Sequence, residues 1–261
     1  MATVDISIFS LFLALLLLTV PIVLSRVYGI GLIRSLIYST IRMSIQLVLI
    51  GIFLKYLFTW NNTILNIIWL AVMILAAVFS VIRGSAMKAS KVLVPAYISF
   101  SLATFTIVLF LNIAVIRLDY VFDARYLIVL GGMLLGNSLR GNIVGITAFY
   151  TSIKKDKKKF LYTLSLGASF NEAILPYLKE SIQLALKPTL AAMATMGIVA
   201  LPGMMTGVIL GGTSPEVAIK YQIMIMIGIV TSTIVSVFLT ILMTLRVCFS
   251  KYGILKEDVF V

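Results

Sequence analysis

The chain has 261 residues, of which 61% are hydrophobic and only 11% are charged, and its mean hydropathy is +1.15. A water-soluble domain of this length has too small an interior to hide so much apolar surface, so the composition excludes a soluble enzyme or binding domain. The formal net charge of +12 does not by itself indicate nucleic acid, because in a membrane protein an excess of Lys and Arg marks the cytoplasmic loops.

The apolar segments are continuous runs, which predict membrane-spanning helices, since backbone groups in hydrocarbon must be paired within the segment. Seven runs approach the roughly 20 residues that cross a hydrocarbon core. In chain order they are 6–24, 36–58, 64–82, 92–116, 126–150, 189–212 and 221–245. We therefore predict an all-α polytopic membrane protein of about seven transmembrane helices, in which residues 1–261 form a single transmembrane domain.

The basic residues predict the orientation of these spans. Residues 1–5 carry no Lys or Arg and Arg26 follows the first run, so this run is an uncleaved span with its N-terminus outside rather than a signal peptide. Seven crossings then place most of the 21 Lys and Arg residues in cytoplasmic segments, as the positive-inside rule expects. These segments are 25–35, 83–91, 151–188 and the C-terminal tail after residue 245. A six-span alternative without the run 36–58 loses this agreement.

The sequence contains no recognisable catalytic or nucleotide-binding motif. It has no phosphate-binding loop, no histidine and a single cysteine, Cys248, so the usual metal and haem sites are excluded and any metal ligands are unknown. None of the nine acidic residues falls within a predicted span, which argues against a proton pump. We predict a transport subunit that is not an enzyme, holds no cofactor of its own and cannot hydrolyse ATP.

The segment 151–188 is predicted to form a cytoplasmic helical hairpin after a lysine-rich run. Gly167 and Ala168 form its turn, and Ser169 with Glu172 has the spacing of a capping box, so a helix begins at Phe170. Its apolar face carries Ile174, Leu178, Ile182 and Ala185. The hairpin either lies flat on the lipid headgroups or docks a soluble partner.

The run 189–212 contains Pro202, which lacks an amide hydrogen and should break or kink the helix near the middle of the bilayer. Broken helices line solute paths in transporters, although a simple packing kink is the alternative. We expect Pro202, Gly203, Met204, Met205, Thr206 and Gly207 to line such a path. Gly203, Gly207 and Gly211 also form a small-residue face that favours close helix packing. Nearby methionines are either soft metal ligands or apolar filler.

The run 126–150 carries a polar group in its middle. Arg140 must face protein or water there, and Asn137, Ser138 and Asn142 are predicted to lie on or near the same face. A solute path lined by Asn137, Ser138, Arg140 and Asn142 is the preferred interpretation, and interhelical hydrogen bonding is the alternative. Gly132 with Gly136, and Gly141 with Gly145, are small-residue pairs.

Several of these motifs together resemble the Fet-type iron-export ABC permease family, which is related to plant aluminium-tolerance permeases. The resemblance runs over most of the chain, and its specific part is the string Leu-Pro-Gly-Met-Met-Thr-Gly at 201–207. The other matching motifs are Gly-Asn-Ser at 136–138, the turn at 166–169, Pro188-Thr189 and Tyr-Gln-Ile at 221–223.

The resemblance implies a permease that pairs with a separate cytoplasmic ABC ATPase, which binds ATP and Mg. Gly167, Ala168, Ser169, Glu172 and Leu178 are then the residues expected to couple the two proteins. We expect a permease homodimer in a bacterial inner membrane that exports a metal ion, with iron as the first metal to test. The alternative is an ion-coupled secondary transporter or channel, and a scaffold or membrane enzyme ranks below both.

Overall fold

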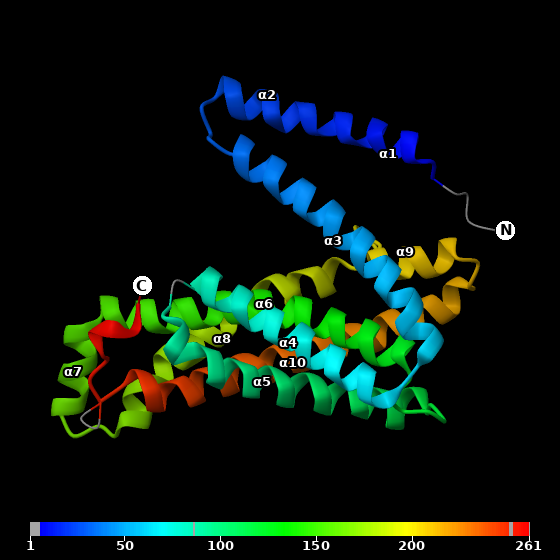
Figure 1. Ribbon diagram of the computed structural model, residues 1–261. Coiled ribbons are helices and arrows are strands. Elements are labelled where there is room, and N and C mark those ends of the chain that lie inside the picture. Colours follow the sequence, from blue (N-terminus) through cyan, green and yellow to red (C-terminus); the bar gives the residue numbers. More distant parts are fainter. Residues whose placement is uncertain (1–5, 86, 251–252, 261) are drawn as a thin grey trace.

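The computed structural model describes residues 6–85, 87–250 and 253–260, and this part of the chain is predominantly helical, without a regular β-strand (Figure 1). The predicted all-α class is confirmed. The prediction of an outer N-terminus concerns residues 1–5, which lie outside the described residues. The α-helices are α1 Ile8–Leu15, α2 Thr19–Val27, α3 Ile33–Trp60, α4 Thr63–Ser85, α5 Ala89–Phe110, α6 Ala124–Lys155, α7 Lys157–Ser165, α8 Phe170–Thr195, α9 Gly203–Leu210 and α10 Pro215–Cys248.

Three shorter helical turns complete the description: the 3-10 turn η1 Leu16–Leu18 joins α1 to α2, the π-helical turn η2 Leu111–Ile116 extends α5, and η3 Glu257–Val259 lies in the tail. Within the described part of the chain, six helical stretches are long and apolar enough to cross a membrane. They are Phe9–Val27, Ile33–Trp60, Thr63–Ser85, Ala89–Ile116, Ala124–Lys155 and Pro215–Cys248. They correspond to six of the seven predicted runs.

The remaining predicted run, 189–212, is divided between two helices. Helix α8 passes through Pro188 and ends at Thr195, and α9 begins at Gly203 with Pro202 as its N-cap residue. A proline can precede or begin a helix because the first amide hydrogens of a helix have no partner within it, whereas inside a helix its ring clashes with the preceding turn. The structure therefore has six continuous spans and one broken segment, α8 with α9.

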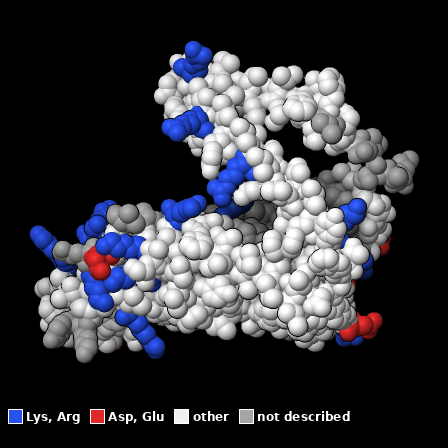
Figure 2. All heavy atoms as spheres, viewed as in Figure 1, with Lys and Arg blue, Asp and Glu red and all other residues white. Residues whose placement is uncertain are grey.

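The connections that the predicted topology assigns to one side of the membrane also lie at one end of the molecule. The α2–α3 and α4–α5 connections, α7 and the C-terminus lie at one end, and the α3–α4 and α9–α10 connections lie at the other (Figure 1). Lys and Arg side chains gather at the end that carries α7 and the C-terminus (Figure 2). Which end faces the cytoplasm stays a prediction of the positive-inside rule.

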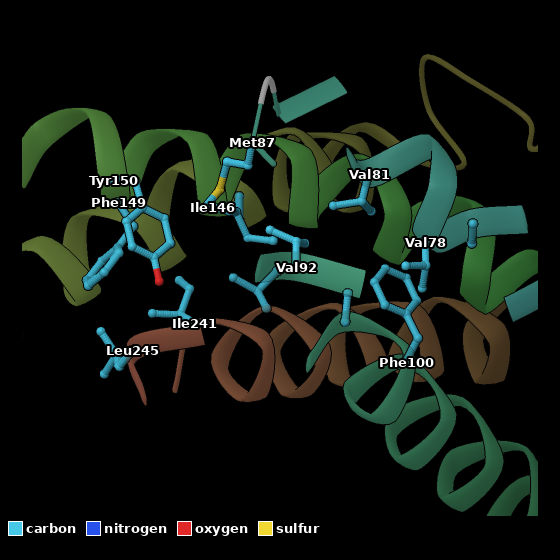
Figure 3. Packing of buried hydrophobic residues seen from close by; sticks show 14 of the residues in the cluster. Val78, Val81, Met87, Val92, Phe100, Ile146, Phe149, Tyr150, Ile241 and Leu245 are labelled. Carbon is cyan, nitrogen blue, oxygen red and sulfur yellow. The ribbon is translucent and has the colours of Figure 1, made fainter. Parts of the chain in front are cut away.

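The core lies among α4, α5, α6, α8 and α10, with α10 in contact with α5, α6 and α8. Val78, Val81 and Val92 lie between these helices, and Tyr150 and Ile241 join α6 to α10 nearer the C-terminal end (Figure 3). By contrast, Ser25 and Leu57 are the only buried residues among the described parts of α1 to α3. Helix α3 therefore joins the bundle only through its C-terminal part, and the N-terminal helices stand apart from it (Figure 1).

Two glycines of α6 set its distance from α8 and α10. A Cβ atom on Gly145 would lie 2.7 Å from Val237 Cγ1 of α10 and 3.3 Å from Ala185 Cβ of α8, and one on Gly141 would overlap the Thr233 methyl group. Small residues matter here because lipid is as apolar as a leucine side chain, so membrane helices gain most from close backbone approach. The Gly141 and Gly145 pair is thus the small-residue face that holds three helices together.

We expect the substitution Gly145→Leu to destabilise the protein by about 1–3 kcal/mol, because the added side chain must displace Val237 or Ala185. The matched control is Gly136→Leu on the same helix, where an added Cβ meets no atom within 4 Å. Apparent unfolding temperatures of the two variants in detergent test this expectation. Equal unfolding temperatures would contradict the proposed role of Gly145.

Candidate functional site

The break between α8 and α9 is a well-defined turn. Met196 caps α8 in an extended conformation, and Gly197 has a positive φ of 87°, which a residue with a side chain rarely adopts. Helix α9 then begins with the amide hydrogen of Thr206 donated to the carbonyl oxygen of Pro202, over a distance of 2.9 Å. The local sequence thus forms a seven-residue connection, 196–202, between two helices that together follow one predicted span.

A cavity of about 560 Å³ lies where this connection meets α10. Four methionines contribute to its lining: Met193 and Met196 from the end of α8, Met205 from α9 and Met226 from α10. Gln222 of α10 also lines it and is only 6% exposed. Its amide nitrogen contacts Met196 Sδ at 3.7 Å, while its buried Oε1 atom has no hydrogen-bond partner in the described structure.

The residues predicted to line a path in 202–207 do not all reach this cavity. Met205 lines it, whereas Met204 packs against the main hydrophobic core, and the Thr206 hydroxyl is satisfied by the carbonyl oxygen of Pro202 at 3.1 Å. A Cβ atom on Gly203 or Gly207 would meet no described atom within 4 Å. The expectation that these glycines form a close helix contact is therefore wrong within the described chain. Sequence reasoning missed Gln222 as a lining residue, although Tyr-Gln-Ile at 221–223 had been noted as a motif.

The predicted polar group of α6 is divided between two faces. Ser138 Oγ lies 3.0 Å from Ser232 Oγ, and Asn142 Nδ2 donates to Ser236 Oγ at 2.8 Å, so both residues join α6 to α10. Both are completely buried. Arg140 is exposed, because a residue two positions away on a helix points nearly in the opposite direction. The prediction of one polar face is therefore wrong.

Arg140 and Asn137 lie on a different side of α6 from the buried residues Ser138 and Asn142. Asn137 is half-buried, and its side-chain amide donates to the carbonyl oxygen of Met133 at 2.9 Å. Arg140 lies near the middle of a 32-residue helix. Of the four predicted path residues on α6, these two are the ones that the packing of α10 leaves available to a solute.

The hairpin of α7 and α8 has the predicted local structure. Gly167 adopts a φ of 92° in the turn, and Ala168 follows it before the helix start at Phe170. Ser169 donates its backbone amide hydrogen to Glu172 Oε2 at 2.8 Å, and the Ser169 hydroxyl accepts the Glu172 amide hydrogen at 3.3 Å. This capping box is confirmed. Hydrogen bonds from Ser169 also hold the pKa of Glu172 below its usual value.

Leu178 differs from the other residues expected to couple this hairpin to a partner. It is buried with Ile174 and Ala185 in the core, on the predicted apolar face, so it cannot touch a soluble protein directly. The large apolar side chains exposed near the turn are instead Tyr162 of α7 and Leu166, its C-cap residue, which are 64% and 70% exposed. The sequence analysis did not predict Tyr162 or Leu166 as contact residues. The one pattern that could have indicated such a contact was the apolar Leu166 directly before Gly167.

An aromatic cluster joins the hairpin to the C-terminal end of α10. It consists of Phe160, Phe170, Tyr177 and Phe249, with the rings of Phe170 and Phe249 centred 5.1 Å apart. Beside it lies a cavity of about 810 Å³, lined in part by Asn171 and Arg246. The hairpin is therefore packed onto a membrane-spanning helix and does not lie free on the lipid surface.

These features define the class of protein: a polytopic helical membrane protein with a broken segment beside a partly open cavity and a basic hairpin at one end. Among the described residues, no group of three or more His, Cys, Asp or Glu side chains could hold a metal ion. The chain belongs to the family described as UPF0014, an uncharacterised protein family, whose model matches residues 8–249.

Three relatives extend this assignment. The chain is 33% identical over 241 residues to the "Probable iron export permease protein FetB" of Escherichia coli (strain K12), covering 88% of this chain and 89% of that protein. It is 31% identical to the "Protein ALUMINUM SENSITIVE 3" of Arabidopsis thaliana, covering 95% and 89% of the two chains. It is 28% identical to the "UPF0014 membrane protein YjkA" of Bacillus subtilis (strain 168), covering 95% and 98%. No solved structure matches the chain significantly. The predicted Fet-type permease family is thus confirmed.

The two faces of α6 predict different effects of substitution. Asn142→Ala should lower stability by about 0.6–1.7 kcal/mol, the range found for hydrogen bonds between membrane helices, because it removes the bond to Ser236. Arg140→Gln should leave stability unchanged, since Arg140 is exposed and lies on the side of α6 away from the buried Ser138 and Asn142. Apparent unfolding temperatures in detergent compare the two variants. A larger loss for Arg140→Gln would contradict the assignment of faces.

The capping box predicts a pH dependence of the first turn of α8. Because the folded pKa of Glu172 is lowered, its stabilising effect is complete above the unfolded value of about 4.3 and is lost as the pH falls through the folded pKa. Hydrogen exchange of amides in the first turn of α8 should therefore lose protection in acid. In Glu172→Gln the protection should already be weaker at neutral pH and should change little on acidification. An unchanged pH profile in this variant would exclude Glu172 as the titrating group.

Proposed function

We propose that this chain is the permease subunit of an ABC exporter, in which a separate cytoplasmic ATPase drives a metal ion out through the membrane. The family membership and the relative named as an iron export permease support a transport role. Iron enters this proposal from that relative's name and is the first metal to test. The ATPase would bind ATP and Mg, and the permease would reside in a bacterial inner membrane.

The continuity of α8 is the observation that carries this proposal. The helix has 26 residues, which corresponds to about 39 Å at 1.5 Å per residue. Its first turn belongs to the hairpin and its last turn lines the methionine cavity. A partner that displaces the hairpin would therefore move one wall of the cavity without any other linking element.

The exposed surfaces of the hairpin suit a soluble partner. Tyr162 and Leu166 offer apolar contacts at the turn, and the run 154–159 contributes five lysines at the same end of the molecule (Figure 2). The aromatic cluster would pass a displacement of the hairpin to α10 as well as along α8. We therefore place the docking site at the turn, with Gly167, Ala168, Ser169 and Glu172 maintaining its shape and Leu178 anchoring it to the core.

A homodimer is part of this proposal because an ABC transporter needs two ATPase copies, and a single short permease offers one hairpin. The exposure of Arg140 supports it. A guanidinium group at the centre of a membrane helix costs about 2.5–3.5 kcal/mol when it faces lipid, so a second chain or an aqueous path must cover it. Residues 1–261 would act as one transmembrane domain in each half of the dimer.

Co-expression with a cytoplasmic ABC ATPase from the same organism tests the proposal. We expect the two proteins to copurify and the permease to change the rate of ATP hydrolysis, in a manner that depends on the transported metal. Failure of both results would overturn the proposal. Transport into vesicles that contain no ATPase would instead favour an ion-coupled secondary transporter.

Substitutions in the hairpin test its role in the same assay of ATP hydrolysis. Gly167→Val strains the turn and Glu172→Gln removes the capping carboxylate, so both variants should lower permease-dependent ATP hydrolysis toward the rate of the ATPase alone. Glu180→Gln is the matched control, because Glu180 is an exposed acid on the same helix, away from the turn. Normal coupling in both turn variants would remove the hairpin from the mechanism.

A further inference from the structure

The exposed face of α10 is an apolar stripe that ends at an arginine. Ile234 and Phe238 are 37% and 39% exposed and lie one helical turn apart. The half-buried Leu242 follows after four residues and the exposed Arg246 after four more, in the last turn of the helix. The predicted span 221–245 ends directly before Arg246. Its side chain therefore lies where the hydrocarbon core meets the lipid headgroups.

The partly open cavity of about 810 Å³ beside the aromatic cluster lies at the same place. Its lining includes the apolar side chains of Leu164, Phe170 and Leu242 and the polar side chains of Asn171 and Arg246. The start of α8 and the end of α10 lie beside each other at the basic end of the molecule (Figure 1). Pockets of about 300–1,000 Å³ are typical of sites for small organic ligands, so the cavity is large enough to hold one.

The charge of this cavity is positive. Arg246 is the only charged residue among the described residues that line it, and it forms no ion pair with a described acid. Glu172 does not line the cavity, and its Oε2 atom accepts hydrogen bonds from the amide and the hydroxyl group of Ser169. The run 154–159 adds five lysines at the same end of the molecule (Figure 2). The cavity therefore attracts anions.

We propose that this cavity binds an anionic phospholipid, with the phosphate group at Arg246 and the acyl chains along the exposed stripe of α10. A guanidinium group presents paired N–H donors that match a phosphate, and basic pockets between membrane helices bind acidic lipid headgroups. Asn171 would donate a further hydrogen bond to the headgroup. Such a site needs only the permease and does not depend on the export of a metal.

The continuity of the cavity with the stripe favours a lipid over a soluble anion. Leu242 belongs both to the lining of the cavity and to the stripe, so the apolar wall of the cavity continues along the exposed side of α10. A soluble phosphate ester would contact only the polar part of the lining. An amphipathic ligand covers both parts at once, and the bilayer supplies it at high local concentration.

A lipid in this position would also strengthen the attachment of the hairpin to α10. The cavity is lined by both Phe170 of α8 and Phe249 at the end of α10, whose rings are centred 5.1 Å apart. A ligand between these elements adds contacts to both of them. Because a ligand that binds only the folded state raises its stability, bound lipid should raise the apparent unfolding temperature in detergent.

Native mass spectrometry of the purified permease in detergent tests the proposal. The probes are phosphatidylglycerol and phosphatidylcholine with identical acyl chains, which differ in net charge. We expect each chain to retain one phosphatidylglycerol in preference to phosphatidylcholine. Equal retention of the two lipids would refute the proposal. Displacement of the lipid by its deacylated headgroup, glycerophosphoglycerol, would show that the ligand is a soluble phosphate ester and would overturn the assignment to a lipid.

Arg246→Gln and Arg83→Gln form a matched pair of variants. Both arginines are exposed and lie in the last turn of a spanning helix, but Arg83 of α4 does not line the cavity. One basic residue beside an anionic lipid changes the affinity about fivefold. We therefore expect Arg246→Gln to weaken phosphatidylglycerol binding by about this factor and Arg83→Gln to leave it unchanged. Equal losses would show that only the overall charge attracts the lipid and would refute the site.

A photoreactive diazirine on an acyl chain of phosphatidylglycerol locates the bound lipid. Peptide mass spectrometry should find the cross-link on α10 near Phe238 and Leu242, and less of it in Arg246→Gln. If a second permease chain covers this stripe, the label will be absent from α10 and the proposal fails. These measurements contain neither ATPase nor metal. Loss of lipid binding with normal ATPase coupling therefore refutes only the lipid site, and the reverse result refutes only the exporter role.

Discussion

The close contact of α6 with α8 and α10 is the constraint on which the rest of the structure depends. In a bilayer the hydrophobic effect does not draw helices together, so their association relies on small residues and on hydrogen bonds between helices. Gly141 and Gly145 allow the three backbones to approach, and Asn142 with Ser236 fixes the register of α6 against α10. Every other feature of the candidate site is positioned relative to these three helices.

This packing also explains why the two ends of α8 could act together. The helix lies against α6 and α10 along its buried face, from Ala173 near the hairpin to Leu186. Beyond Leu186 it carries no buried residue and reaches the break, where α9 and α10 complete the methionine cavity. A rigid middle and a less constrained end are what a transporter needs if a force at the hairpin is to change the shape of a distant site.

The N-terminal helices, unlike α8, make few contacts with the rest of the bundle. Helices α1 to α3 expose apolar side chains on most of their surface, and α3 reaches the bundle only where Leu57 packs against Ala124 and Ile128. An exposed Arg42 on α3 and an exposed Arg140 on α6 are both unsuited to lipid. In any membrane protein such groups must meet water or protein. In the proposed homodimer, the side of α6 that carries Arg140 is where we would expect the second permease chain to pack.

The sequence by itself determined the features that depend on local chemistry. Six spans followed from hydropathy, the start of α8 followed from the spacing of Ser169 and Glu172, and the break followed from Pro202. Only the tertiary structure decided which polar residues of α6 face α10, that Leu178 is buried, and that Gln222 shares a cavity with methionines from three segments. These facts depend on the rotation of each helix about its axis and on contacts between distant segments, and a pattern of hydropathy specifies neither.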